Sequence, residues 1–325
     1  MIAVTGASGR LGRLVLRLLL EHVDAASVLA LSRSPAAGAE LGVASRLLDF
    51  DDPDTLPRAF DGVDRLMIIS TNVFDPNGRR VRQHANAVRA AARAGVGHLV
   101  YTSISCADDP AHPAAVAADH RATEAVLADC GVPYTVLGNC MYTELIVMGL
   151  DATLATGLML DNCGAGASAY VSRVDCAAVA AAVLAGGGHE GQRLNVTGPQ
   201  ALTQWEIAAL LTEFSGVPVQ YVPIRDEETV AGLVAHGMPE PTARQFATIG
   251  RSIREGYTST VTDVVERTTG RKATSIADFL AAAFDVASYR GDRMGPAGPR
   301  PGSVRGGPRR RGYPGSRGAG RRPPR

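Results

Sequence analysis

Three glycines near the start of the chain have the spacing of a phosphate-binding turn. Gly6, Gly9 and Gly12 form a G-x-x-G-x-x-G pattern between an apolar run at residues 2–4 and a helical pattern at residues 13–20. In such a unit the first glycine permits a tight turn, the second lets the backbone approach a pyrophosphate, and the third lets the helix pack closely. Free N–H groups at the helix start then face the anion. The pattern predicts a dinucleotide site; an ordinary glycine-rich turn is the alternative.

A basic residue follows the second predicted strand, where the adenosine ribose of a dinucleotide is normally bound. Residues 27–32 read SVLALS and precede Arg33, with no acidic residue nearby. An acid there would bind the 2′-hydroxyl of NAD, whereas an arginine suits the 2′-phosphate of NADP. Arg33 therefore favours NADP, a solvated loop arginine being the alternative. Asp49, after the next strand, is a candidate for the adenine edge.

These residues depend on elements that alternate between strand and helix. Strands are expected at residues 2–4, 27–32, 44–48, 65–70, 98–103 and 133–137, with helices at 53–60, 79–94 and 117–129 among them. The alternation predicts an α/β fold with a doubly wound parallel sheet. Polar side chains follow the fourth strand at residues 70–72 and the sixth at residues 139–144, where open α/β sheets bind ligands. Gln83 and His84 are candidates for substrate contact, with a structural role as the alternative.

Composition divides the chain into three regions. Residues 1–140, completed by 169–188, are expected to form the nucleotide-binding domain, and 141–289 mainly a substrate lobe. From residue 290 the chain consists largely of Gly, Pro and Arg, with eleven Arg and one Asp. Such a segment buries too little apolar surface to fold, so we expect a disordered basic tail. The tail either has no function or contacts a polyanion weakly.

Cysteine spacing and hydropathy indicate whether the chain binds a metal or crosses a membrane. The five cysteines form no C-x-x-C pair and no zinc spacing, and no run of residues is long and apolar enough for a membrane span. No basic segment followed by an apolar one suggests a signal peptide. We therefore expect a cytoplasmic protein without a metal site.

Longer motifs resemble one branch of a known superfamily. VTGASGRLG, QHANAVRAAARAGV before YTS, NCMYTE after PYTVLGN, and SRVDCAAVAAAVL are similar to motifs of the NmrA-like atypical short-chain dehydrogenase/reductases, especially the bacterial type-2 NAD(P)H:quinone oxidoreductases. The match covers residues 1 to about 286. It implies a Rossmann domain that binds NADPH and a smaller α+β C-terminal lobe, and it allows a homodimer.

The resemblance also implies roles for individual residues. The pyrophosphate would be surrounded by Gly6, Ala7, Ser8, Gly9, Arg10 and Leu11, and the 2′-phosphate bound by Arg33. The cofactor would run along Ser70, Thr71 and Asn72. The nicotinamide and substrate would be bordered by Asn139, Cys140, Met141, Tyr142, Thr143 and Glu144, with Arg173 reaching in from a later helix. The chain departs from the family at Gly138, where arginine is typical, and at Cys140–Met141, where Gly-Trp is common, which affects substrate identity.

The usual short-chain catalytic pair, Tyr-x-x-x-Lys, is absent. Lys272 is the only lysine, and the residue four positions before it is Thr268. The lysine of that pair lowers the tyrosine pKa so that the tyrosine can protonate a carbonyl. Its absence argues against alcohol–ketone chemistry and against a sugar-nucleotide epimerase. It allows reduction of a quinone, whose product anion is stabilised by conjugation.

The expected function is therefore an NADPH-dependent reductase of quinones or similar conjugated electrophiles. Tyr142 is the candidate to orient or protonate the quinone oxygen, and Asn139 the candidate to hold the carboxamide or the backbone of the site. The alternative from another class is a non-catalytic NADP(H)-binding redox sensor, which the NmrA-like branch also contains.

Overall fold

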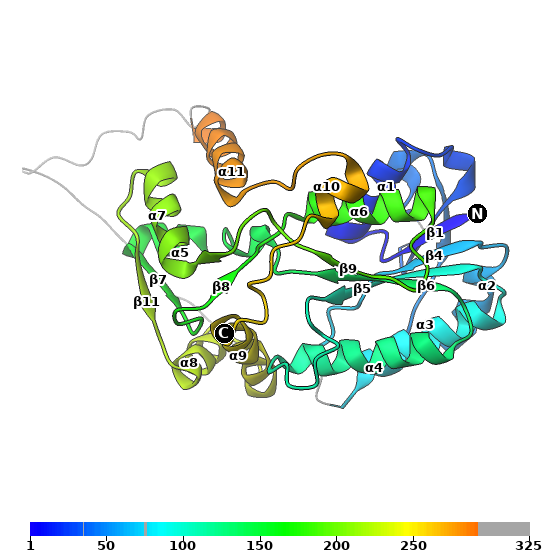
Figure 1. The fold of residues 1–325 in the computed structure, drawn as a ribbon, viewed down its shortest axis with the longest axis horizontal. Coiled ribbons are helices and arrows are strands. Elements are labelled where there is room, and N and C mark those ends of the chain that lie inside the picture. The colour runs from blue at the N-terminus through cyan, green and yellow to red at the C-terminus, as the bar shows by residue number, and fades with distance from the viewer. Residues whose placement is uncertain (35, 75–76, 292–325) are drawn as a thin grey trace, which may run out of the picture. The chain divides into compact units, whose positions relative to one another are not determined.

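A computed structural model describes residues 1–34, 36–74 and 77–291. These residues contain a parallel sheet with the strand order β3-β2-β1-β4-β5-β6-β9 (Figure 1). Its strands are β1 (Ile2–Thr5), β2 (Val28–Ser32), β3 (Ala44–Leu47), β4 (Arg65–Ile68), β5 (His98–Ile104), β6 (Tyr134–Asn139) and β9 (Arg193–Val196). The strand order reverses between β1 and β4, which is the kind of switch point where open α/β sheets bind ligands.

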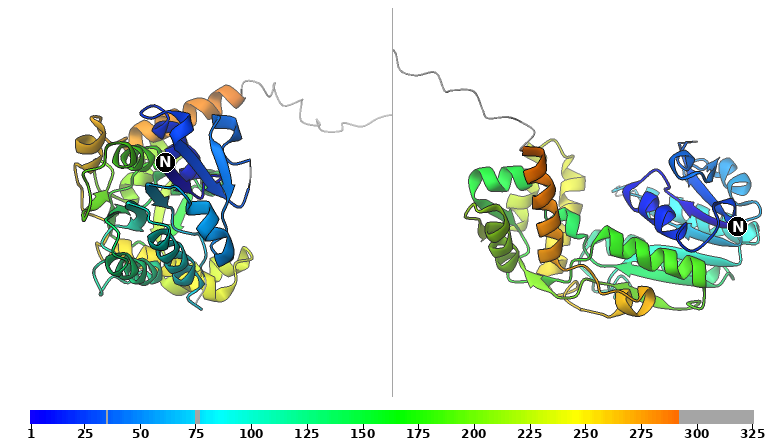
Figure 2. Two further views of the ribbon diagram at one scale, coloured as in Figure 1. Left: turned by 90° about the vertical axis from the view of Figure 1, so that its right-hand side faces the viewer. Right: turned by 90° about the horizontal axis from the view of Figure 1, so that it is seen from above.

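Helices cover both faces of this sheet. One face carries α1 (Arg10–Leu19), α6 (Arg173–Gly186) and α10 (Val264–Thr269), and the other carries α2 (Leu56–Phe60), α3 (Arg79–Arg93) and α4 (Ala115–Asp129) (Figure 1). Figure 2 shows α6 lying along the sheet. Successive strand residues point to opposite faces, so Val4 joins the core beneath α1 and α6, whereas Ala3 joins the core beneath α2 and α3. The expected doubly wound fold is confirmed.

The later part of the chain adds smaller elements. They are α5 (Leu150–Thr156), β7 (Leu158–Asp161), β8 (Ala167–Ser168), β10 (Leu202–Thr203), α7 (Gln204–Ser215), β11 (Gln220–Pro223), α8 (Asp226–Ala235), α9 (Glu240–Arg254) and α11 (Ile276–Gly291). β7 pairs with β11 and β8 with β10. A third core gathers around Ile207, Leu211 and Leu280. This is the expected α+β portion; residues Met1–Asp285 form one compact unit, and the division at residue 140 stays a prediction.

Two boundaries next to the glycine turn differ from the expectation. α1 begins at Arg10 rather than at residue 13, because Arg13 N–H already bonds the Gly9 carbonyl at 3.0 Å. β4 ends at Ile68 rather than at residue 70. The N–H of Ile69 bonds Thr5 Oγ1 at 2.9 Å and that of Ser70 bonds Thr102 Oγ1 at 2.8 Å, so neither continues the ladder. The chain after β4 is thus held by hydroxyl groups instead of by a neighbouring strand.

Other differences lie in the later part. The elements α5, β7 and α10 were not expected from the sequence. β11 begins only at Gln220, because the N–H groups of Val217 and Val219 bond the hydroxyls of Ser215 and Thr212. Pro218, between them, has no N–H to donate.

The expected basic tail, beyond Arg290, lies almost entirely outside the described residues. Within the described ranges, no helix combines the length and apolarity needed to cross a membrane.

Candidate functional site

The glycine turn joins β1 to α1 and is shaped by close backbone contacts. Gly6 has φ +61°, a conformation that favours glycine. Gly9 N–H bonds the Gly6 carbonyl at 2.8 Å, which closes the turn. A Cβ on Gly12 would lie 2.3 Å from Gly6 O, and one on Gly9 would lie 3.1 Å from the same atom. Gly12 therefore cannot carry a side chain unless the turn shifts.

This turn fits the phosphates of a dinucleotide. Gly9 caps α1 without any side-chain hydrogen bond, so the first N–H groups of the helix stay available to an anion. Ser8 Oγ accepts a hydrogen bond from Ser32 Oγ at 2.9 Å, which ties the turn to the end of β2. Arg33, the next residue after that strand, is exposed. A cation thus stands at the edge of the turn, where the sequence predicts the 2′-phosphate.

A cavity of about 310 Å³ lies at the carboxyl ends of β4, β5 and β6. Two of the predicted groups meet on it: Ser70, Thr71 and Asn72 on one side, and Asn139, Cys140, Met141 and Tyr142 on the other. The glycine turn contributes Leu11. Further wall residues are Ile69, Phe74, Arg80, Thr102, Ser103, Ile104, Ser105, His112, Ala114, Val116, His120, Leu145, Ile249, Ser252 and Thr258. The glycine turn and the polar strand ends therefore adjoin one cavity.

The segment at residues 70–72 is fixed by α3. Thr71 N–H donates to His84 Nε2 at 3.0 Å, and Thr71 Oγ1 donates to Gln83 Oε1 at 2.8 Å. His84 is fully buried, and burial followed by the charge of Arg80 lowers its pKa to about 3. His84 is therefore neutral, with its proton on Nδ1, which lies 3.1 Å from Thr123 Oγ1. Of the two roles considered for Gln83 and His84, the contacts support the structural one.

Asn139 and Tyr142 form a hydrogen-bonded pair on the cavity wall. Asn139 Nδ2 donates to the Tyr142 hydroxyl oxygen at 3.3 Å, and the buried Asn139 Oδ1 has no partner among the described residues. Burial raises the pKa of Tyr142 well above its usual value. Tyr142 therefore keeps its proton at neutral pH, and because its oxygen accepts from Asn139, that proton is directed elsewhere.

Three other predicted residues support Tyr142 from behind. Arg173 places its guanidinium carbon 4.7 Å from the centre of the Tyr142 ring. Its side chain pairs with Glu144 at 3.5 Å, and its backbone N–H donates to the same carboxylate at 3.0 Å. Thr143 is buried, and its N–H bonds the Val171 carbonyl at 3.0 Å. None of Thr143, Glu144 and Arg173 is among the cavity-lining residues. Arg173 lies over the ring of Tyr142, and Glu144 holds Arg173 there.

Several wall residues were not predicted from the sequence. Arg80, His112 and Thr258 come from α3, from the loop before α4 and from the segment after α9, and no local motif connects them. At the two places where the chain departs from the family it resembles, Cys140 and Met141 line the cavity. Gly138 does not, and a Cβ there would lie 2.5 Å from Asn195 Oδ1.

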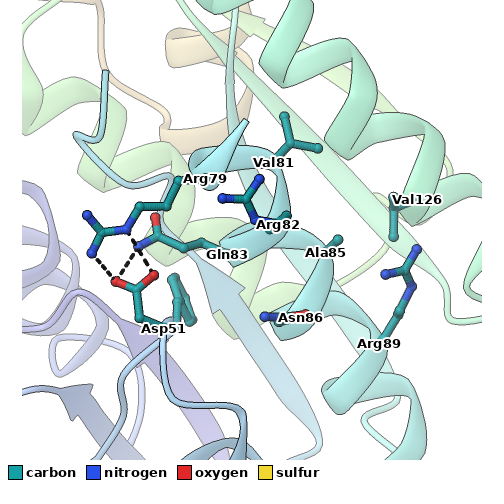
Figure 3. A pocket seen from close by; sticks show the side chains of 10 residues that line it. Asp51, Arg79, Val81, Arg82, Gln83, Ala85, Asn86, Arg89 and Val126 are labelled. Carbon is teal, nitrogen blue, oxygen red and sulfur yellow. Dashed lines mark hydrogen bonds and ion pairs between the residues drawn. The ribbon is translucent and has the colours of Figure 1, made fainter. Parts of the chain in front are cut away.

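A second cavity, of about 580 Å³, lies on the outside of α3 and shares no lining residue with the first. Figure 3 shows Asp51 next to Arg79 and Gln83, with their interactions as dashed lines. Arg79 Nε donates to Asp51 Oδ1 at 3.1 Å and Gln83 Nε2 to Oδ2 at 2.9 Å, and the Arg79 hydrogen bond lowers the pKa of Asp51. The charges of this cavity are thus partly compensated within the chain. The described residues contain no group of three or more His, Cys, Asp or Glu placed to hold a metal ion.

Comparison with known proteins identifies the family. Residues 6–186, more than half of the chain, match a family described as NAD(P)H-binding. Quinone oxidoreductase 2 of Escherichia coli is 34% identical over 289 residues, which cover 88% of this chain and 99% of that protein. An NmrA-like family domain-containing oxidoreductase of Aspergillus flavus is 32% identical over 238 residues, 70% of this chain and 75% of that protein.

Solved structures support the same family assignment. The E. coli quinone oxidoreductase in complex with NADPH superimposes with a TM-score of 0.82 at 34% identity, covering 87% of this chain and 100% of that one. The Citrobacter sp. triphenylmethane reductase in complex with NADP(H) gives 0.81 at 37% identity over the same shares. The expected cofactor, NADPH, is thereby confirmed. The chain belongs to the NAD(P)H-binding family, in its NmrA-like atypical short-chain reductase branch near quinone oxidoreductase 2, and is an NAD(P)H-dependent reductase.

Proposed function

We propose that the protein reduces a quinone or a similar conjugated acceptor bound in the cavity at the ends of β4, β5 and β6. The observation that carries the proposal is the meeting of Asn139, Tyr142 and the 70–72 segment on one largely apolar cavity beside the glycine turn. Flat conjugated rings suit such a wall, and a few polar atoms fix their orientation. The relatives named above act, by their names, on quinones and on triphenylmethane compounds, which are both conjugated.

The chain offers a place for each part of the cofactor. Gly6 to Leu11 would hold the pyrophosphate, and Arg33 would favour the 2′-phosphate. The segment Ser70, Thr71, Asn72 and the facing Asn139 would border the nicotinamide end. When bound there, NADPH supplies a hydride, and the protein supplies position and exclusion of water.

Tyr142 and Asn139 would act on the acceptor. Reduction of a quinone to a hydroquinone consumes one hydride and one proton, so the site needs a proton source besides the cofactor. Tyr142 stays protonated, and with Asn139 bonded to its oxygen at 3.3 Å it would present its O–H to the acceptor oxygen. Conjugation stabilises the product anion, so its protonation need not accompany hydride transfer. A hydrogen bond from the Tyr142 hydroxyl, with water able to supply the proton, would then replace the missing Tyr-x-x-x-Lys pair.

The test is NADPH oxidation by the purified chain with a panel of small quinones and no added flavin or metal. The proposal expects loss of the NADPH absorbance matched by hydroquinone formation. Tight NADPH binding with no turnover on any quinone or enone would contradict it and would favour the redox-sensor alternative.

A further inference from the structure

We propose that the cavity prefers acceptors that carry an anionic substituent, a carboxylate or a sulfonate, and that Arg80 is the cation that binds this substituent. The inference rests on the proposed function, since it names a class of acceptor for the same site. The charges on the cavity wall support it. Arg80 is the only charged residue among those that line the cavity, and none of the described lining residues is acidic.

Arg80 is a buried cation that forms no ion pair with any carboxylate in the described part of the chain. Arg80 is 4% exposed. In the described ranges, no Asp or Glu lies within ion-pair distance of its guanidinium group. Its buried Nε has no hydrogen-bond partner there either. Burial lowers the pKa of Arg80, the direction expected for a cation withdrawn from water, while Asp119 offsets this only through a longer-range interaction. A buried cation that no described carboxylate contacts directly is costly, and an anion bound in the cavity would relieve that cost.

The guanidinium is held in place from behind. Arg80 Nη2 donates to His120 Nε2 at 2.9 Å, and because arginine only donates, His120 must carry its proton on Nδ1. His120 Nδ1 then donates to the Tyr101 hydroxyl at 2.8 Å. Burial keeps the pKa of His120 well below its usual value, so this residue stays neutral and adds no charge of its own. The Phe74 ring, 5.8 Å from the guanidinium carbon, covers one side. Among the described residues, only His120 accepts a hydrogen bond from the guanidinium, so most of its five N–H donors have no partner there.

Neighbouring arginines on the same helix are arranged differently. Arg79 pairs with Asp51 at the second cavity, on the outside of α3, where Figure 3 also shows Arg82. Arg82 is exposed and donates to the Asn77 carbonyl at 2.5 Å. Arg79 and Arg82 do not line the cavity that contains Arg80. Arg82 is therefore a matched control, because it is an arginine two positions further along α3 that is not part of that cavity's wall.

The experiment measures the affinity of two probes for the full chain loaded with NADP⁺, by calorimetry. The probes are anthraquinone sulfonate and anthraquinone sulfonamide, which share a ring system and differ in charge. We expect the sulfonate to bind wild type about tenfold more tightly, the value of one charge-assisted contact. The sulfonamide should displace it from a single site. Arg80→Gln should abolish the preference and Arg82→Gln should retain it, with NADPH affinity unchanged in both.

Four results would overturn the inference. In wild type, these are equal affinity of the two probes, or bound sulfonate that the sulfonamide cannot displace. In Arg80→Gln, they are a preference for the sulfonate that persists, or a loss of NADPH affinity, which would assign Arg80 to a cofactor phosphate. The first two need no variant and hold even if Arg80→Gln does not fold. If Arg80 binds the sulfonate but NADPH reduces neither probe, the proposed function is wrong while the inference about Arg80 stands. If NADPH reduces both probes and the two bind with equal affinity, the inference about Arg80 is wrong while the proposed function stands.

Discussion

The glycine turn is made of backbone atoms from one continuous stretch, residues 5–12, whereas the cavity is made of side chains drawn from residues 11–258. The turn depends on three residues that carry no side chain, and a Cβ added to Gly12 would overlap the carbonyl oxygen of Gly6. In the cavity, side chains are held in place by other side chains: Thr71 by Gln83, and Tyr142 by Asn139 and Arg173. The two regions should therefore respond differently to substitution, the turn through loss of cofactor and the cavity through loss of turnover or stability.

The largest effect is expected at Gly12. In Gly12→Ala the new Cβ would stand 2.3 Å from Gly6 O, so the turn must shift. If that shift costs about 3 kcal/mol, as severe overpacking does, NADPH affinity falls roughly a hundredfold. Titration of the variant with NADPH measures this. Gly186→Ala, at an exposed position whose Cβ would meet nothing, is the control and should bind as wild type does. Unchanged affinity in Gly12→Ala would remove the turn from the cofactor site.

Tyr142→Phe should show the opposite pattern, with turnover lost and NADPH affinity kept. The variant lacks the hydroxyl that accepts from Asn139 but keeps the ring beneath Arg173. If Tyr142 donates the proton, kcat on a quinone falls by roughly 10²-fold, as for general-acid catalysis. A loss of only a few-fold would mean that water provides the proton, and an equal loss of NADPH affinity would mean that the hydroxyl serves the cofactor.

His84 should make stability depend on pH. Its pKa is about 3 in the folded protein against an ordinary 6.5, so below pH 6.5 the unfolded chain binds a proton that the folded one does not. Stability is therefore lost as the pH falls from 6.5 toward 3. Between pH 7 and pH 5 the contribution is about 2 kcal/mol in the free energy of unfolding.

Denaturant unfolding at the two pH values tests this. His84→Gln should lose about 2 kcal/mol less than wild type on acidification. His236→Gln, at an exposed position, should keep the wild-type dependence. The same pH dependence in His84→Gln and wild type would show that His84 is protonated inside the fold.

The smallest effect is expected at Arg33, where the side chain is exposed. Arg33→Ala should weaken NADPH about tenfold, the lower end for a charge-assisted contact, and leave NADH nearly unchanged. Arg17→Ala, another exposed arginine near the end of α1, should change neither affinity. Equal losses for both cofactors in Arg33→Ala would mean that Arg33 acts through the fold.

The same contrast explains how much could be predicted from the sequence. The glycine turn could be located because its spacing, its strand and its helix are adjacent in the chain. The 70–72 and 139–142 segments could be located because each follows an apolar strand, and parallel strands end at one edge of a sheet. The early sheet and its helices followed from the same alternation.

Other parts of the site could not be predicted, because packing alone decides them. In the sequence Arg80 is one arginine among several in a helical pattern; only the packing of α3 against α4 buries it beside His120. His112 and Thr258 reach the cavity from loops that carry no motif. Gln83 and His84 suited two roles until the backbone of Thr71 was seen to donate to His84.

In the proposed reaction, hydride passes directly from NADPH to an acceptor held in the cavity. This can be measured in a single turnover with the full chain, NADPH deuterated at the transferable position and a small quinone, in the absence of flavin and metal. We expect one hydroquinone for each NADPH consumed, and slower transfer from the deuterated cofactor than from ordinary NADPH. Bound NADPH that remains reduced in the presence of every quinone tested would contradict it.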